Sequence, residues 1–256
     1  MDTKTLSLTV AYIGSDYHGF TRQEGLPTIQ GELENALSTV FRHPVETVGA
    51  GRTDAGVHAH GQTVSFRIDA ADLGERQLSQ IKNSLNALTP DSISIRAIIE
   101  READFSARFS AVEREYRYRL VAAESPALFL APYVWWLPDS RINLNKMREA
   151  ASYLEGEHDF KSFCVASSAE DKNTIREIKH IHIFGMDHLG EPCLVIQVIG
   201  NAFLHSMVRI IVGSLVDVGY SRREPEWVKE VLAGKDRRLA GQTAPAQGLT
   251  LWRVRY

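Results

Sequence analysis

The sequence predicts an α+β fold built from two similar split βαβ modules, of the ferredoxin or RRM-like kind, with mostly antiparallel sheets that flank a central active-site cleft. Two observations support this prediction. The first half of the 256-residue chain has the element order β-α-β-β-α-β, which is typical of two helices packed on one face of an antiparallel sheet. The second half follows a similar order, although no residue-level repeat accompanies it.

In the first half, period-two alternation predicts a strand over Leu6–Ile13, and apolar residues at every fourth position predict a helix over Thr28–Phe41. A second helix is indicated by Leu78, Ile81, Leu85 and Leu88, and further strands are expected over Val45–Val48, Thr63–Ile68 and Ile93–Ile99. A charged segment at Glu100–Phe105 separates two strand patterns. We therefore expect an N-terminal module of residues 1–104 and a C-terminal module of residues 105–256.

In the second half, strands are expected over Glu113–Val121, Ile175–Phe184, Leu194–Ile199 and Leu249–Val254. Helices are expected over Leu144–Leu154, capped by Asn143, over about Ala202–Val218, and from Pro225 onward, because Pro is common in the first helical turn. The stretch Ala122–Asp139 contains prolines, Trp135 and Trp136. It is predicted to be a loop packed by its own aromatic side chains.

The composition excludes several classes of protein. An apolar content of 44% is ordinary for a packed globular chain, and the sequence shows neither a signal-peptide pattern nor an apolar run of about 18 residues, so a cytoplasmic location is expected. Cys164 and Cys193 have no metal or redox spacing. The pairs His58/His60 and His180/His182 are too few for a metal site, and no phosphate loop or dinucleotide fingerprint occurs, so we expect no metal and no cofactor.

The net charge of −3 argues mildly against a nucleic-acid partner, because phosphate binding usually needs a basic surface. The distribution of charge matters more than the sum. Arginines gather between Arg108 and Arg119, and a second basic group lies between Arg222 and Arg238. A locally positive cleft on a slightly acidic protein is therefore compatible with the sequence.

The string from Gly51 to Ala59 reads GRTDAGVHA and places Asp54 two residues after Arg52 and two before Gly56. In an extended segment alternate side chains project to the same side, so Arg52 and Asp54 can face one cleft. Gly56 allows a ligand to approach the backbone closely. The plain alternative is an ordinary turn, since Asp-Ala-Gly is common turn chemistry.

Two further segments contain candidate site residues. The strand Arg114–Arg119 alternates aromatic and basic residues, with Tyr116 and Tyr118 on one face, which suits either a structural strand or a tyrosine that stacks on a base. In the predicted helix, Ala202, His205, Ser206, Arg209 and Gly213 form one narrow stripe. Arg209 can therefore be a solvated surface arginine, or one that reaches a carboxylate or a phosphate.

These motifs closely resemble those of the TruA family of tRNA pseudouridine synthases. The resemblance rests on GRTDAGVHA, on Phe105–Ser110 with the Tyr-Arg-Tyr run, and on Gly200–Arg209, and also includes His158–Phe163 and Ala240–Leu249. It thus extends along nearly the whole chain. Three positions depart from the family pattern: Phe20–Gln23 lacks the usual Gly-Trp, Ser206 stands where a second His is common, and Gln247 replaces a frequent His.

The resemblance implies isomerisation of uridine to pseudouridine in the anticodon arm of tRNA, at positions 38 to 40, by a homodimer without a cofactor. It places the catalytic aspartate at Asp54, the active-site tyrosine at Tyr116 and a partner arginine of the aspartate at Arg209. Arg52, His58 and Tyr116 are the expected substrate contacts. Attack by Asp54 on C1′ or on base C6, or removal of the C2′ proton, all stay open.

Two rival functions agree with the same sequence. The first is a catalytically silent RNA-binding module, because paired split βαβ sheets are common platforms for single-stranded RNA. The combination of Asp54, Tyr116 and Arg209 argues against it. The second is a related synthase with a different uridine target, which the absence of charged insertions or tails disfavours.

Overall fold

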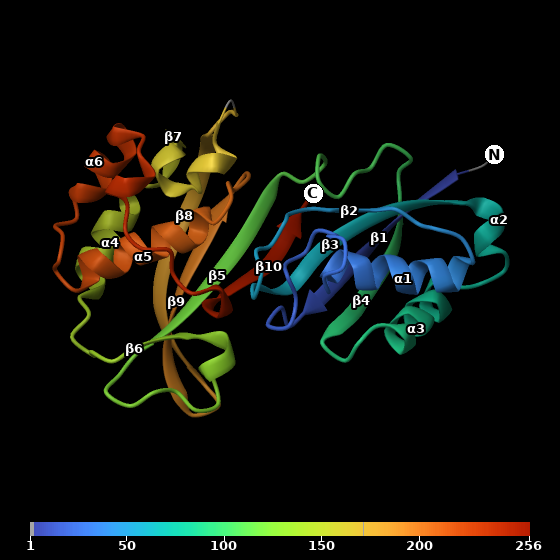
Figure 1. Cartoon of the computed structure of the whole chain (residues 1–256), viewed down its shortest axis with the longest axis horizontal. Helices are drawn as coiled ribbons and strands as arrows, with labels where there is room; N and C mark the ends of the chain where they lie inside the picture. The colour runs from blue at the N-terminus through green and yellow to red at the C-terminus, as the bar shows by residue number, and fades with distance from the viewer. Residues whose placement is uncertain (1–2, 171) are drawn as a thin grey trace. The chain divides into compact units, whose positions relative to one another are not determined.

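The computed structural model describes residues 3–170 and 172–256 and divides the chain into two compact units (Figure 1). Unit 1 contains the residues up to Val112 together with Leu251–Tyr256, and unit 2 contains Glu113–Thr250. The strands pair in a mostly antiparallel manner and six α-helices accompany them among the described residues. The predicted α+β class is therefore confirmed.

In unit 1 the strands lie in the order β4, β1, β3 and β10, with the short β2 also paired to β3. Their bounds are β1 (Thr3–Tyr12), β2 (Thr47–Gly49), β3 (His58–Asp69), β4 (Ile93–Arg101) and β10 (Leu249–Arg255). β3 pairs with β1 and with β2 in antiparallel register, and β1 pairs with β4 in the same manner. The Asp54 loop joins β2 to β3 and is therefore anchored by strands at both ends.

The helices of unit 1 are α1 (Ile29–Phe41), the short α2 (Ala70–Leu73) and α3 (Leu78–Leu88). In α1, apolar side chains from Ile29 to Phe41 are buried at helical spacing, and the ring of Phe41 contacts that of Phe66 on β3. Figure 1 shows α1 and α3 side by side against the strands of this unit. The predicted helix over Thr28–Phe41 is correct to within one residue, because Thr28 is its N-cap.

The boundary of unit 1 lies beyond the predicted position after residue 104. The segment around Ala107 is bonded to unit 1, since the Ala107 N–H donates to Ser65 Oγ at 3.0 Å and the Tyr256 hydroxyl donates to the Ala107 carbonyl at 2.9 Å. The Val112 N–H also donates to the Arg255 carbonyl, at 2.9 Å. Residues 251–256 thus fold with unit 1, although they come after all of unit 2 in the sequence.

In unit 2 the strands lie in the order β5, β9, β8 and β7, all antiparallel, with β6 parallel to β5. Their bounds are β5 (Glu113–Ala122), β6 (Trp135–Leu137), β7 (Gly156–Asp159), β8 (Ile175–His188) and β9 (Glu191–Gly200). The helices are α4 (Leu144–Ser152), α5 (Met207–Gly219) and α6 (Trp227–Gly234). α4 and α5 pack against each other, with Phe160 and Phe163 fully buried in the core of this unit.

Two expectations for unit 2 are wrong. The long helix starts at Met207 rather than near Ala202, because Ser206 has the left-handed backbone conformation (φ 58°) and interrupts any helix through it. The predicted loop contains strand β6, and its buried side chains are mainly aliphatic: Leu130 and Val134 join a buried cluster with Val121, whereas Trp136 is 38% exposed.

Candidate active site

The Asp54 loop of unit 1 is held by hydrogen bonds of the neighbouring residues, and Asp54 itself is partly exposed. The Thr53 hydroxyl is 2.7 Å from the hydroxyl of Tyr12, and the Thr53 carbonyl accepts the Phe20 N–H at 3.1 Å. The Val57 N–H closes a turn on the Asp54 carbonyl at 3.2 Å, where Gly56 adopts φ 78°. Fixing the residue before Asp54 and closing the turn behind it gives the Asp54 backbone a defined position.

The neighbouring candidates on this loop differ in accessibility. Arg52 is exposed, so its guanidinium is accessible to a phosphate or a base. His58, in contrast, is 4% exposed, and its Nδ1 accepts the Gly14 N–H at 3.1 Å. The structure therefore gives His58 a contact that positions the loop, and leaves little of its surface for a substrate.

The two tyrosines of β5 have different surroundings. Tyr116 is 7% exposed, and its ring meets that of Phe203 edge to face at a centroid distance of 5.1 Å. Tyr118 is fully buried, its hydroxyl donates to the Pro245 carbonyl at 2.8 Å, and burial raises its pKa. Of the two, Tyr116 keeps a small exposed surface and Tyr118 keeps none. The sequence did not predict Phe203 as its ring partner, because that residue lies in a predicted helix.

The charged side chains of β5 at Glu115, Arg117 and Arg119 are buried or half-buried. Glu115 is fully buried, and its Oε1 accepts from Arg117 Nε at 2.9 Å and from Gln197 Nε2 at 2.6 Å. Both faces of the strand are thus at least partly covered, and Glu115 Oε1 is paired with neighbouring polar groups inside unit 2. This pattern favours a rigid strand as the support of Tyr116.

Arg209 lies in the first turn of α5 and is oriented by the segment from Ala240 to Gly248. Its Nε–H donates to the Ala244 carbonyl at 2.8 Å, while the Ala244 N–H donates back to the Arg209 carbonyl at 3.1 Å. The Nε–H bond orients the plane of the guanidinium, and the backbone bond ties the segment to α5. Only two residues of the stripe predicted from Ala202 to Gly213 lie within α5: Arg209 and Gly213, which share one helix face. Residues 202, 205 and 206 lie before its first residue.

The same segment crosses α5 at Gly213, where backbone meets backbone. A Cβ atom on Gly213 would lie 1.8 Å from the Gln242 carbonyl oxygen. We expect Gly213→Ala to lower the free energy of unfolding by about 2 kcal/mol or more, because the crossing segment must shift. Urea unfolding of the variant measures this loss. Gly185→Ala in β8 is the matched control, since a Cβ there meets nothing within 4 Å; equal losses in both variants would contradict the steric explanation.

No helix within residues 3–170 and 172–256 is long and apolar enough to cross a membrane. Over the same residues, no group of three or more His, Cys, Asp or Glu side chains is arranged to hold a metal ion.

Comparison with known proteins gives extensive matches. The sequence model of the family described as tRNA pseudouridine synthase matches residues 8–110 and 150–256. A tRNA pseudouridine synthase A of Geobacillus kaustophilus is 41% identical over 256 residues, covering 99% of this chain and 95% of that protein. Proteins of the same name from a Thermotoga species and from Fervidobacterium nodosum are 39% and 42% identical, covering 99% of this chain and 100% of each relative.

Among solved structures, a chain of the one titled "Crystal Structure of a Cbf5-Nop10-Gar1 Complex" aligns with 82% of this chain and 45% of its own length. Its TM-score is 0.35 at 12% identity, which supports no argument about the fold. The sequence matches, in contrast, cover 99% of this chain and at least 95% of each of these relatives, and they include the motif regions described above. The chain belongs to the tRNA pseudouridine synthase family.

Proposed function

We propose that this chain isomerises uridine to pseudouridine in the anticodon stem-loop of tRNA, at one or more of positions 38, 39 and 40, with Asp54 as catalytic nucleophile or base. The observation that carries the proposal is the partly exposed Asp54 in a loop whose backbone is fixed on both sides of it, in a chain of this family. Positions and residue roles follow from the resemblance of the motifs.

The reaction breaks the bond from ribose C1′ to uracil N1, turns the base and joins C1′ to C5. The C5 proton leaves to solvent and N1 gains a proton, so atoms and electrons balance without an oxidant, a reductant or an energy source. Asp54 attacks C1′ or base C6, or removes the C2′ proton. In each route the carboxylate must be ionised when the reaction starts.

Residues of both units are assigned to this one reaction on the resemblance of their motifs. Arg52 contacts the RNA backbone or fills the stack that the extruded uridine leaves. Arg209 stabilises the ionised, correctly aimed form of Asp54. Tyr116 packs on the target ring, and His58 positions the loop. We also propose that each unit is a variant of the split βαβ module, which the strand orders β4-β1-β3 and β5-β9-β8 support.

The Tyr116 hydroxyl has a testable second role, removal of the C5 proton after the new bond forms. If Tyr116 acts by packing alone, Tyr116→Phe retains the parent rate to within about threefold, because the ring and its edge contact with Phe203 stay. Single-turnover formation of pseudouridine measures this rate. A loss of about a hundredfold or more would assign the proton transfer to the hydroxyl.

The assembly and location of the protein are part of the proposal. A homodimer binding tRNA is expected from the resemblance, and the tRNA substrate favours a cytoplasmic location. Light scattering of the purified protein is the direct test of the dimer, since a mass near 28.6 kDa would contradict it.

The deciding experiment measures tritium release from a tRNA transcript labelled at uridine C5. We expect release from transcripts with uridines at positions 38 to 40 and none when those three are cytidines. Release that persists after this replacement would support pseudouridine synthase activity but reject positions 38 to 40 as its targets. Binding of tRNA without any release would reject the reaction and favour the RNA-binding module.

A further inference from the structure

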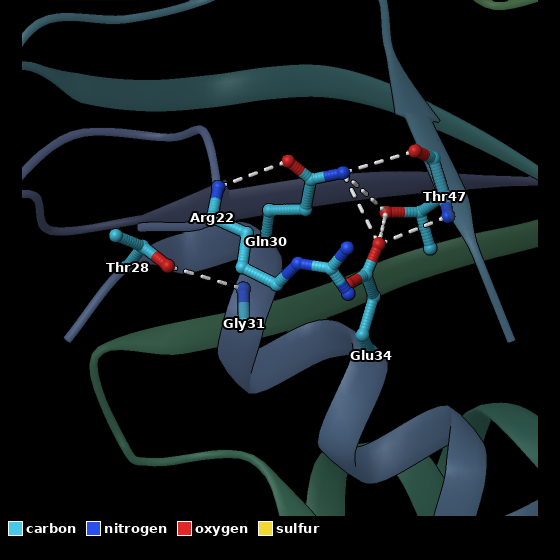
Figure 2. Close-up of polar contacts among 6 residues, drawn as sticks. All are labelled: Arg22, Thr28, Gln30, Gly31, Glu34 and Thr47. Atoms are coloured by element: carbon cyan, nitrogen blue, oxygen red, sulfur yellow. Dashed lines mark hydrogen bonds and ion pairs between the residues drawn. The ribbon is translucent and has the colours of Figure 1, made fainter. Parts of the chain in front are cut away.

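A buried carboxylate in unit 1 lies at the centre of a hydrogen-bond network beside the Asp54 loop. Glu34 is on α1 and is 7% exposed. Its Oε1 accepts from the Thr47 N–H and hydroxyl, both at 3.0 Å, and from Gln30 Nε2 at 3.1 Å. Its Oε2 accepts from Arg22 Nη1 at 2.9 Å. Figure 2 shows the four residues converging from α1, from β2 and from the loop before α1.

Gln30 completes the network one helical turn before Glu34. Its Oε1 accepts the Arg22 N–H at 3.1 Å, and its Nε2 donates to the Thr47 carbonyl at 3.0 Å. The start of the helix is itself fixed, because Thr28 Oγ1 accepts the Gly31 N–H at 3.3 Å (Figure 2). Both side chains therefore reach out from a well-defined helix end.

The network has little freedom to rearrange. A buried carboxylate is costly unless it is hydrogen-bonded, and charge-assisted bonds are the strong ones. Here four donors converge on the two oxygens of Glu34, and they come from three separate segments of the chain. A change in the spacing of these segments breaks a bond to a buried charge.

The first route from the network to Asp54 passes through the segment that contains Phe20. The Gln30 N–H donates to the Phe20 carbonyl at 2.9 Å, and the Phe20 N–H donates to the Thr53 carbonyl at 3.1 Å. Two successive bonds thus connect the start of α1 to the residue before Asp54. Arg22, bonded to Gln30 and Glu34, fixes the same segment two residues further on.

The second route passes through β2. Thr47 is its first residue, Gly49 is its last, and the Asp54 loop follows directly. The Phe20 ring lies so close to Gly49 that a Cβ there would be 2.4 Å from a ring carbon. The Phe20 segment and β2 therefore contact each other directly. Glu34 is bonded to both, through Arg22 on one side and Thr47 on the other.

We propose that Glu34, with Gln30, is a positioning residue for Asp54: its carboxylate sets the spacing between the Phe20 segment and β2, and thereby the placement of the catalytic loop. This inference rests on the proposed role of Asp54. Glu34 does not touch the substrate, so its loss lowers turnover and leaves tRNA affinity unchanged. A displacement of the loop by a fraction of an ångström to about 1 Å costs about 10- to 100-fold in rate.

The test uses Glu34→Gln, which keeps the shape of the side chain. Whichever way the new amide turns, its NH₂ group faces a donor, either Arg22 Nη1 or the Thr47 N–H. We expect the single-turnover rate at saturating enzyme to fall about 10- to 100-fold, with the tRNA dissociation constant within about threefold of the parent value. Thr47→Val is the second, milder variant, because it removes the hydroxyl and retains the backbone N–H; we expect a smaller fall in rate from it.

Asn86→Ala is the matched control for a merely structural role. The Asn86 amide bonds both the N–H and the carbonyl of Ile95, at 2.8 and 2.9 Å, and ties α3 to β4, the strand on the far side of β1 from β3. It should lower the melting temperature and leave the rate unchanged. The inference is wrong if Glu34→Gln and Thr47→Val retain the parent rate. It is also wrong if all three variants, Asn86→Ala included, lose rate in the same proportion to their loss of stability.

The same assay separates this inference from the proposed function. The parent protein and its Asp54→Asn variant are measured alongside. Release by the parent but not by Asp54→Asn establishes the role of Asp54. A parent-like rate in Glu34→Gln then rejects only the positioning role of Glu34. No release by the parent, or equal release by Asp54→Asn, rejects the proposed function and this inference together.

Discussion

Asp54→Asn is expected to reduce tritium release by about 10⁴-fold or more, to the background of the assay. The amide keeps the volume of the side chain and the turn closed by the Val57 N–H on the Asp54 carbonyl. It removes the negative charge that each of the three chemical routes requires, as nucleophile or as base. The loss should therefore come from chemistry and not from folding.

Binding and stability measurements complete this prediction. The tRNA dissociation constant of Asp54→Asn should stay within about threefold of the parent value, since a carboxylate adds nothing to phosphate binding. Asp91→Asn, an exposed aspartate between α3 and β4 of the same unit, is the matched control and should leave the rate unchanged. Residual turnover in Asp54→Asn within tenfold of the parent would remove Asp54 from the catalytic role.

Arg209→Lys should have the second largest effect, a fall of about 10²- to 10³-fold in turnover. Lysine keeps the positive charge but has no counterpart to the Nε–H, which donates to the Ala244 carbonyl at 2.8 Å. Without that bond the cation is no longer oriented by the Ala240–Gly248 segment. The charge is retained, so a large loss would show that orientation matters more than charge.

The readout for Arg209→Lys is the division between turnover and affinity. We expect the single-turnover rate to fall while the tRNA dissociation constant changes by less than about threefold. Arg222→Lys is the control in the same unit, because Arg222 pairs with Asp217 at 2.9 Å on the surface and such exposed pairs contribute little. Loss of binding with normal turnover in Arg209→Lys would instead make Arg209 a phosphate contact.

Long, strongly periodic elements could be predicted from the sequence. The helix α1 was predicted to within one residue, because its apolar residues recur every four positions and Thr28 is a good cap. The start of α5 was not, since the apolar pattern continues through residues whose backbone turns left-handed at Ser206. Short strands such as β6 and β7 contain three and four residues, too few for periodicity to reveal.

The candidate site was predictable only where a motif marks it. Asp54, Tyr116 and Arg209 could be named because they stand in strings that resemble a family. Their supports could not, because hydrogen-bond partners are set by tertiary packing: Ala244 lies 35 residues from Arg209. Glu34 gave one signal, a charged residue next to the buried Leu33, but nothing in the sequence pairs it with Thr47.

Strand β10 has a consequence for how the chain is made. Its residues from Leu251 onward belong to unit 1, next to β3, but a ribosome synthesises them after the whole of unit 2. Until then β3 lacks one of its strand neighbours, and an open strand edge invites pairing with other chains. Contacts such as the His60–Trp252 ring stack at 4.2 Å are likewise absent. Because β3 begins at His58, directly behind the Asp54 loop, a nascent chain acquires the complete support of this loop only after unit 2 has been translated.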